Sequence, residues 1–261
     1  MPAGLIDTHC HLDTEAFDAD RDEVIARALA AGITGMLVPA IRPRMWAALR
    51  AMARGPVRIA LGIHPQVVPV LDADEVRDFA GSDAADAIAR AVTEAGACAV
   101  GECGLDGATG ARELQEQLLR AHVRAARLVG RPLVIHVLRA HDAAPRILRE
   151  ERVHEVGGVM HSYSGGADLV PVYRDLGLCF SFAGPVTYPN ARKPLEASRA
   201  VPDDLLLAET DAPDQSSRGG RSEPAYVADV IAALAAARAV SPEAMAALTT
   251  KNACRLFGFP S

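Results

Sequence analysis

The stretch Leu133-Val134-Ile135-His136 combines an uninterrupted run of large apolar side chains with a histidine at its end. A run of this kind fits a parallel sheet covered on both faces, because an antiparallel strand with one face in water would alternate apolar and polar residues. Helix-type spacing precedes the stretch over residues 113–129, where Gly130 provides a stop, and follows it over residues 140–150. The stretch therefore predicts one strand–helix unit of an α/β fold.

The same alternation of short apolar runs and helical patterns recurs along the chain. It predicts eight strands, over residues 5–8, 33–39, 57–62, 97–101, 133–137, 158–161, 178–183 and 205–209. With 261 residues, one α/β domain spanning residues 1–261 and built as a (β/α)₈ TIM barrel is favoured over an open doubly wound sheet. No G-x-G-x-x-G follows the first strand to indicate a dinucleotide site. Two terminal helices are expected over residues 224–238 and 241–257, the second with Ser241 as N-cap.

Composition excludes several classes of protein. The formal net charge of −6 argues against a broad basic surface that coats nucleic acid or anionic membrane. We find no signal-peptide pattern at the start and no apolar run long enough to span a bilayer, so we expect a cytoplasmic protein without a membrane partner. The 5 cysteines are scattered and show no C-x-x-C pair, which argues against a disulfide framework or a zinc ribbon. The sequence indicates no protein partner.

Potential metal ligands occur where the predicted strands end. His9 and His11 lie two residues apart in an extended segment, so their side chains point to the same side. Single histidines in apolar runs are usually hydrogen-bonded core residues. Parallel barrels gather the carboxyl ends of all their strands at one rim, however, and ligand-type residues follow four more strands. The complete set predicts a metal site of His9, His11, Glu102, His136, His161 and Asp211.

Several motifs resemble those of the TatD family of metal-dependent deoxyribonucleases over nearly the whole chain. They are Ile6-Asp7-Thr8-His9-Cys10-His11, Gly62-Ile63-His64-Pro65, Gly101-Glu102-Cys103-Gly104-Leu105-Asp106, Ile135-His136, His161-Ser162-Tyr163-Ser164-Gly165, Glu209-Thr210-Asp211-Ala212-Pro213 and the stretch from Arg218 to Tyr226. The resemblance implies two divalent ions, one held by His9, His11, Glu102 and Asp211 and the other by Glu102, His136 and His161. It also implies hydrolysis of DNA from the 3′ end. Neither of the two lysines, Lys193 and Lys251, ends the fourth strand, which excludes a carbamylated-lysine bridge there.

This resemblance leads to a hypothesis for the mechanism. Two cations would acidify a bridging water toward a pKa of about 7, and the resulting hydroxide would attack phosphorus. Asp211 is the candidate general base. Nitrogen and oxygen ligands of this kind do not show whether the bound ions are Mg²⁺, Mn²⁺ or Zn²⁺. The chain departs from the family pattern at Leu138 and in the small loop after Asp106, both near the expected substrate.

Three further residues are candidates for binding substrate. His64 follows the third strand and is expected to face the rim, where it can donate to a phosphate. Arg218 and Arg221 lie in a Gly-rich loop and are candidates for a bidentate phosphate clamp, or else for a solvated loop. Asp13 and Asp106 are expected to orient metal-binding histidines or to cap loops.

Three functions remain open from the residues alone. An exonuclease that binds DNA 3′ ends or short oligonucleotides is compatible with the acidic net charge. The same ligand set also suits a binuclear hydrolase of an ester, lactone or amide. A non-catalytic binding protein is disfavoured because a full ligand set accompanies a candidate base.

Overall fold

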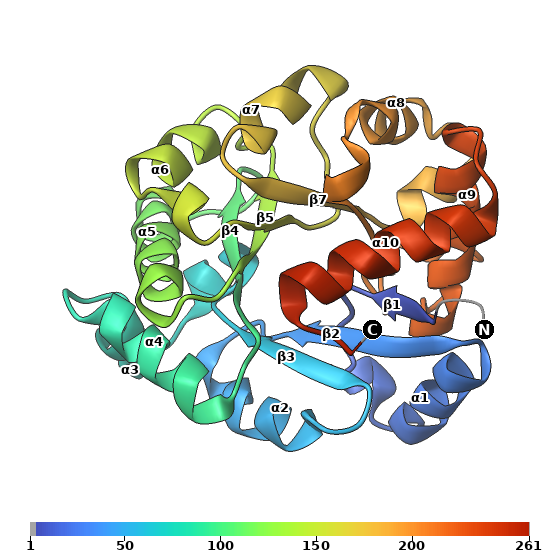
Figure 1. The fold of residues 1–261 in the computed structure, drawn as a ribbon. Helices are drawn as coiled ribbons and strands as arrows, with labels where there is room; N and C mark the ends of the chain where they lie inside the picture. The colour runs from blue at the N-terminus through green and yellow to red at the C-terminus, as the bar shows by residue number, and fades with distance from the viewer. Residues whose placement is uncertain (1–3, 261) are drawn as a thin grey trace.

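Eight parallel strands form one sheet in consecutive order in the computed structural model, which describes residues 4–260 (Figure 1). Each strand pairs in parallel with the next one along the chain. The strands are β1 (Leu5–Asp7), β2 (Ile33–Pro39), β3 (Val57–Leu61), β4 (Ala99–Asp106), β5 (Leu133–Leu138), β6 (Gly158–Met160), β7 (Leu178–Phe182) and β8 (Leu206–Ala208). All eight strands predicted from the sequence are therefore present.

The segments that follow β1 and β8 close the sheet. The Asp211 backbone N–H donates to the His9 carbonyl at 2.9 Å, and the His11 N–H donates to the Ala212 carbonyl at 2.6 Å. Cys10 and Ala212 form an isolated parallel bridge. The sheet is thus a nearly closed barrel, and the predicted TIM-barrel fold class is confirmed. That residues 1–261 form a single domain stays a prediction, and residues 1–3 and 261 lie outside the described residues.

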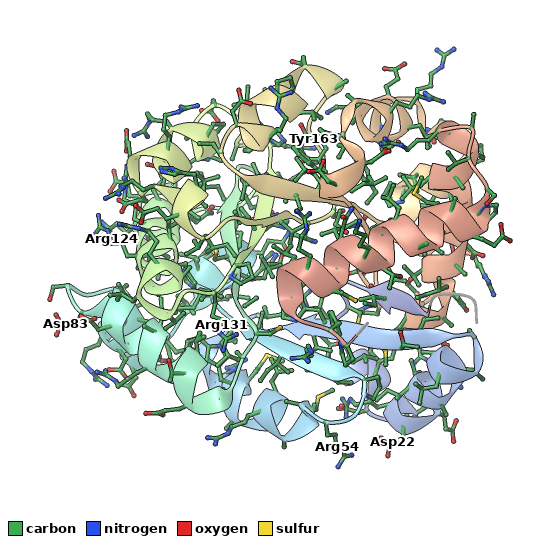
Figure 2. The ribbon with its side chains drawn as sticks, in the orientation of Figure 1. Asp22, Arg54, Asp83, Arg124, Arg131 and Tyr163 are labelled. Atoms are coloured by element: carbon green, nitrogen blue, oxygen red, sulfur yellow. The ribbon has the colours of Figure 1, made fainter. Side chains whose placement is uncertain are left out.

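Helices surround the barrel and present charged side chains to solvent. Figure 2 shows Asp22, Arg54, Asp83 and Arg124 pointing outward from this ring. The helices are α1 (Arg21–Ala30), α2 (Trp46–Met52), α3 (Ala73–Phe79), α4 (Ala84–Ala95), α5 (Arg112–Val129), α6 (Ala144–Glu150), α7 (Val170–Arg174), α8 (Arg192–Ala200), α9 (Val227–Ala237) and α10 (Pro242–Phe257). Among residues 4–260, no single helix is long and apolar enough to cross a membrane, although α9 and α10 pass that test as a pair bent by 112°.

The two predicted terminal helices are α9, preceded by a short 3-10 segment (Pro224–Tyr226), and α10. Ser241 caps α10 as expected, because its Oγ accepts from the Ala244 N–H at 3.2 Å. Helix α10 lies across one end of the barrel (Figure 1). There Phe257 joins the apolar side chains that fill the barrel interior, including Ile6 and Leu37. This end is closed by packing, which leaves the opposite end for polar side chains.

Strand β4 is longer than predicted, and Glu102 lies inside it instead of ending it. The pairing of β4 with β5 shifts register between Val100 and Cys103, so the regular alternation of side chains is interrupted at Glu102. The predicted strand ended at Gly101, because the apolar run of residues 97–101 does not continue past Glu102. In the structure, Gly104 pairs with His136 and allows the two backbones to approach closely.

Gly104→Ala should destabilise the barrel strongly. Gly104 has a φ of +148°, and a Cβ there would lie 1.9 Å from the His136 carbonyl oxygen. Backbone strain and overpacking together should lower the free energy of unfolding by about 3 kcal/mol or more. Urea denaturation measures the change, with Gly110→Ala as the control because a Cβ at Gly110 meets nothing within 4 Å. Equal stability of the two variants would contradict this account of β4.

His122 makes folding stability depend on pH. It is buried in α5, where Nε2 accepts from the Ile63 N–H at 3.1 Å and Nδ1 donates to the Leu118 carbonyl at 2.7 Å. Burial lowers the pKa of His122 from 6.5 to about 4. On acidification, His122 therefore binds a proton at a higher pH in the unfolded chain than in the folded protein. The contribution of neutral, buried His122 to the free energy of unfolding is complete above pH 6.5 and is lost as the pH falls toward 4.

His122→Gln should flatten that pH dependence. Over the window from pH 7 to 4, the variant should lose less of its free energy of unfolding than the wild type does, by up to about 3 kcal/mol. Chemical denaturation at a series of pH values measures the two slopes. The exposed His154 supplies the control variant His154→Gln, which should keep the wild-type slope. A wild-type slope in His122→Gln would show that His122 does not titrate in this way.

Candidate metal centre

The first group of predicted ligands gathers around one oxygen of Glu102. His9 Nε2 and His11 Nε2 lie 3.2 Å apart, and their distances to Glu102 Oε2 are 3.1 and 3.5 Å. Both nitrogens also lie 3.7 Å from Asp211 Oδ1. The closing contacts between the ends of β1 and β8 bring these residues together. Two imidazoles and two carboxylates thus converge on one point.

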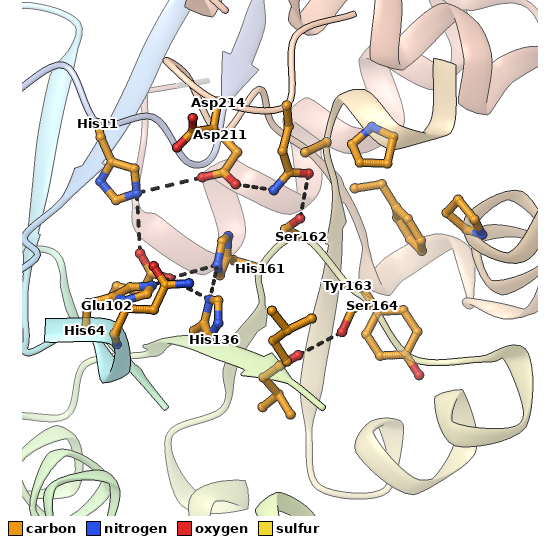
Figure 3. A pocket seen from close by; sticks show the side chains of 18 of the residues that line it. His11, His64, Glu102, His136, His161, Ser162, Tyr163, Ser164, Asp211 and Asp214 are labelled. Carbon is orange, nitrogen blue, oxygen red and sulfur yellow. Dashed lines mark hydrogen bonds and ion pairs between the residues drawn. The ribbon is translucent and has the colours of Figure 1, made fainter. Parts of the chain in front are cut away.

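A second group gathers around the other oxygen of Glu102. Oε1 lies 2.8 Å from His161 Nε2, 3.3 Å from His136 Nδ1 and 2.9 Å from His64 Nε2. His136 and His161 come from the neighbouring strands β5 and β6, and their facing nitrogens are 3.1 Å apart. Figure 3 shows the carboxylate between these rings and His11. Glu102 therefore faces two groups of ligands, one with each oxygen.

The chemistry of this cluster fits divalent cations. Glu102 is fully buried, yet neither of its oxygens has a partner in hydrogen-bond geometry among the described residues, although imidazole nitrogens lie close to both. The imidazole nitrogens face one another and the Glu102 carboxylate, so several lone pairs point into the same small volume. A cation bound there would interact with all of them. His9, His11 and Glu102 form one group able to hold a metal, and His64, Glu102 and His136 form another.

Burial and neighbouring charges shift the pKa values of the groups in the cluster. Burial acts to raise the pKa of Glu102, but the surrounding histidines, His161 foremost, lower it well below its ordinary value. The carboxylate in turn overcomes the burial of His161 and raises the pKa of that histidine well above 6.5. Burial lowers the pKa of His11 to about 3 and raises that of Asp211 to about 6. A bound cation would compete with protons for these nitrogen and oxygen atoms.

A second layer of carboxylates holds the ligands in place. Asp7 Oδ1 accepts from the His9 N–H at 3.2 Å, while Oδ2 accepts from the Thr210 hydroxyl at 2.6 Å. Glu209 Oε1 lies 3.3 Å from His161 Nδ1. Asp106 Oδ2 lies 3.4 Å from His136 Nε2, so Asp106 stands beside a predicted ligand, and its orienting role stays a prediction. A carboxylate beside the far ring nitrogen can orient a ligating histidine, but His136 Nε2 and His161 Nδ1 have no partner in hydrogen-bond geometry among the described residues.

Sequence reasoning missed Asp7 and Glu209 as members of this layer, although both stand two residues before a predicted ligand. That spacing is the signal, because side chains two apart in a strand share a face. Asp13 was expected to orient a histidine or to cap a loop. In the structure, its carboxylate oxygens have no hydrogen-bond partner among residues 4–260, so the orienting role is not seen.

His64 lies closer to the metal ligands than the sequence suggested. It lines the same pocket, as expected for a residue on the rim, but its Nε2 faces Glu102. Its Nδ1 accepts from the Gln66 N–H at 3.1 Å, which requires the proton on Nε2 when the ring is neutral. Burial lowers the pKa of His64. A neutral His64 thus presents a donor to the centre of the cluster.

Arg218 and Arg221 do not line the pocket. The Arg218 guanidinium donates to Asp229 at 2.7 and 3.0 Å and stacks over the ring of Tyr226. Arg221 donates to Asp20 at 2.8 and 2.6 Å. A phosphate clamp would require both arginines to leave these partners. Their role in substrate binding stays a prediction, and the contacts observed favour the structural alternative.

The cluster forms one end of a cavity of about 550 Å³. Asp211 faces this cavity, and its Oδ2 accepts a hydrogen bond from Gln215 Nε2. The Ser162 hydroxyl in turn donates to Gln215 Oε1 at 2.9 Å (Figure 3). Gln215 was not singled out in the sequence, because it lies in the loop after β8 and no strand pattern places it.

Comparison with known proteins identifies relatives over the full length. The family model described as "TatD related DNase" matches residues 6–258. The chain is 35% identical to the uncharacterized metal-dependent hydrolase YabD of Bacillus subtilis, with 97% of this chain and 98% of that protein covered. It is 31% identical to a protein of Klebsiella pneumoniae named 3′-5′ ssDNA/RNA exonuclease TatD, with 97% and 98% covered.

Solved structures agree with this relationship. The crystal structure of YjjV, a TatD homologue from Escherichia coli K12, superimposes with a TM-score of 0.88 at 30% identity and covers 100% of both chains. A lactonase from Listeria monocytogenes shares the fold at 15% identity, with a TM-score of 0.64 and coverage of 100% of this chain and 96% of that chain. The matching strands, the convergent ligand set and the family model lead to one conclusion: this chain belongs to the TatD family and is a TatD-type metal-dependent hydrolase.

Proposed function

We propose that the protein is a phosphodiesterase that removes nucleotides from the 3′ ends of DNA, and that it uses two divalent ions. The observation that carries this proposal is the buried Glu102, whose two oxygens face two separate groups of ligands. The family model's description and the name of the Klebsiella relative support nucleic acid as the substrate.

The ligand groups assign the two ions. His9, His11, Glu102 and Asp211 would hold one ion, and Glu102, His136 and His161 the other, with His64 beside the second. Bound there, two cations would supply Lewis-acid stabilisation of the phosphoryl oxygens and lower the pKa of a water to about 7. The nitrogen and oxygen donors are compatible with Mg²⁺, Mn²⁺ or Zn²⁺.

The chain's own residues would handle the proton and the phosphate. Asp211 faces the cavity with one carboxylate oxygen toward the ligands and the other held by Gln215, which fixes its orientation. In this position Asp211 would accept the proton of the attacking water and later pass it to the alcohol that leaves the phosphorus. His64, with its proton on Nε2, would donate to a phosphoryl oxygen.

The shape and charge of the molecule favour strand ends over long duplexes. A cavity of about 550 Å³ has room for a nucleotide or two, and the net charge of −6 disfavours a broad contact with duplex DNA. Short oligonucleotides and single-stranded 3′ ends are therefore the proposed substrates. Hydrolysis of an ester, lactone or amide by the same centre is the alternative that the assay below separates.

Removing the bridging carboxylate should reduce the metal content. Elemental analysis of the purified wild-type protein dialysed against Mn²⁺ or Zn²⁺ should give two ions per chain. Glu102→Gln should retain fewer than one, because both ligand groups lose their shared negative charge. Glu94→Gln, on an exposed position of α4, is the matched control and should retain two. Two ions in Glu102→Gln would refute the bridging role.

Cleavage of DNA tests the proposed reaction. With a single-stranded oligonucleotide labelled at its 5′ end, the wild type should shorten the strand stepwise from the 3′ end, and a chelator should stop this. Asp211→Asn should lower turnover at least about 100-fold, since general-base catalysis contributes about 10²–10⁴-fold. Asp175→Asn, on an exposed residue outside the pocket, is the control.

Two outcomes would contradict the proposal. Intact DNA together with turnover of esters or lactones would replace nuclease activity by the alternative function. Near-normal turnover of Asp211→Asn with metal still bound would remove Asp211 as the base.

A further inference from the structure

Part of the cavity wall is formed by residues other than the predicted metal ligands. That wall carries apolar side chains from β5, β7 and the segment before α8, among them Leu138, Phe182 and Val186. Lys193, in the first turn of α8, lines the cavity beside them. Among the residues that line the cavity, Lys193 is the only lysine or arginine. The cavity therefore contains one permanent positive charge besides any metal.

The Lys193 ammonium group is available to a ligand. Its Nζ donates to the Ser164 carbonyl at 2.7 Å, which uses one of its three N–H donors. In the part of the chain that the structure describes, no carboxylate forms an ion pair with Lys193. Arg218 and Arg221, which the sequence suggested as the phosphate clamp, are by contrast engaged with Asp229 and Asp20. Lys193 is thus a cation of the cavity lining without an acidic partner among the described residues.

A hydrogen-bond network holds the carbonyl that orients Lys193. The Ser164 hydroxyl donates to the Val137 carbonyl at 2.8 Å and lies 3.2 Å from His141 Nε2. His141 Nδ1 lies 2.7 Å from the Tyr173 hydroxyl. With the Nε2–H tautomer, every one of these groups has a donor matched to an acceptor. Val137 directly follows the ligand His136, so the network ties Lys193 to the strand end that carries the metal centre.

We propose that Lys193 forms a second anion subsite in the cavity and determines specificity by binding the phosphate next to the scissile one. This inference rests on the proposed function. The metal centre would hold the phosphate that reacts, the apolar wall would contact the nucleoside, and the two free N–H groups of Lys193 would donate to the neighbouring phosphate. Substrates with two or more phosphates would then be preferred over those with a single phosphate.

A binding experiment tests this subsite without requiring turnover. Calorimetry in the presence of Mn²⁺ compares thymidine 3′-monophosphate with thymidine 3′,5′-bisphosphate, which differ by the 5′-phosphate that would reach Lys193. The wild type should bind the bisphosphate about tenfold more tightly, as expected for one charge-assisted hydrogen-bonded contact. Lys193→Gln should bind both ligands equally and keep the wild-type affinity for the monophosphate. Lys193→Arg should keep most of the preference.

Lys251 provides the matched control, because it is the only other lysine of the chain and lies exposed on α10. Lys251→Gln should keep the tenfold preference. A preference retained in Lys193→Gln, equal wild-type affinities for the two ligands, or no binding of either would overturn the subsite. A protein that shows the Lys193-dependent preference but leaves DNA intact would refute the proposed nuclease activity while supporting the subsite.

Discussion

The fully buried carboxylate of Glu102 is the constraint on which the site depends. A carboxylate removed from water is costly unless charge and hydrogen-bonding groups compensate it. Here five imidazole nitrogens lie within 3.5 Å of its two oxygens. They come from the ends of β1, β3, β5 and β6, so the barrel must close correctly for the charge to be compensated. The ligand geometry and the closure of the barrel are therefore one requirement.

The contacts that close the barrel also orient the ligands. Asp7 binds the backbone of His9 and both the backbone and side chain of Thr210, so one carboxylate connects β1, β8 and a ligand. Burial raises the pKa of Asp7 to about 8, although the hydrogen bonds from Thr210 and His9 act to lower it. Asp211 follows with a φ of +57°, a conformation that costs energy in a residue with a Cβ. The strain is held by the His9–Asp211 backbone contact and directs the carboxylate to the metal ligands.

The cavity is asymmetric in charge, and this asymmetry gives a substrate a direction. Carboxylates and imidazoles that could hold cations line part of it, and a single lysine lines it together with apolar side chains. A molecule with spaced negative groups and apolar surfaces between them could contact the bound cations, the apolar side chains and Lys193 together. A small neutral ester would use only the metal end.

The sequence by itself determined the eight strands and the six side chains that meet at one rim as predicted metal ligands. Apolar runs and helical spacing are local properties, and a parallel barrel brings the carboxyl ends of its strands to one rim whatever the loops do. The tertiary structure decided which groups face each other. It turned His64 toward Glu102, extended β4 past Glu102, and paired Arg221 with Asp20, 201 residues away in the chain. Contacts of that kind depend on loop paths and on competition between side chains, which no local pattern encodes, and they left Lys193 as the one lysine or arginine that lines the cavity.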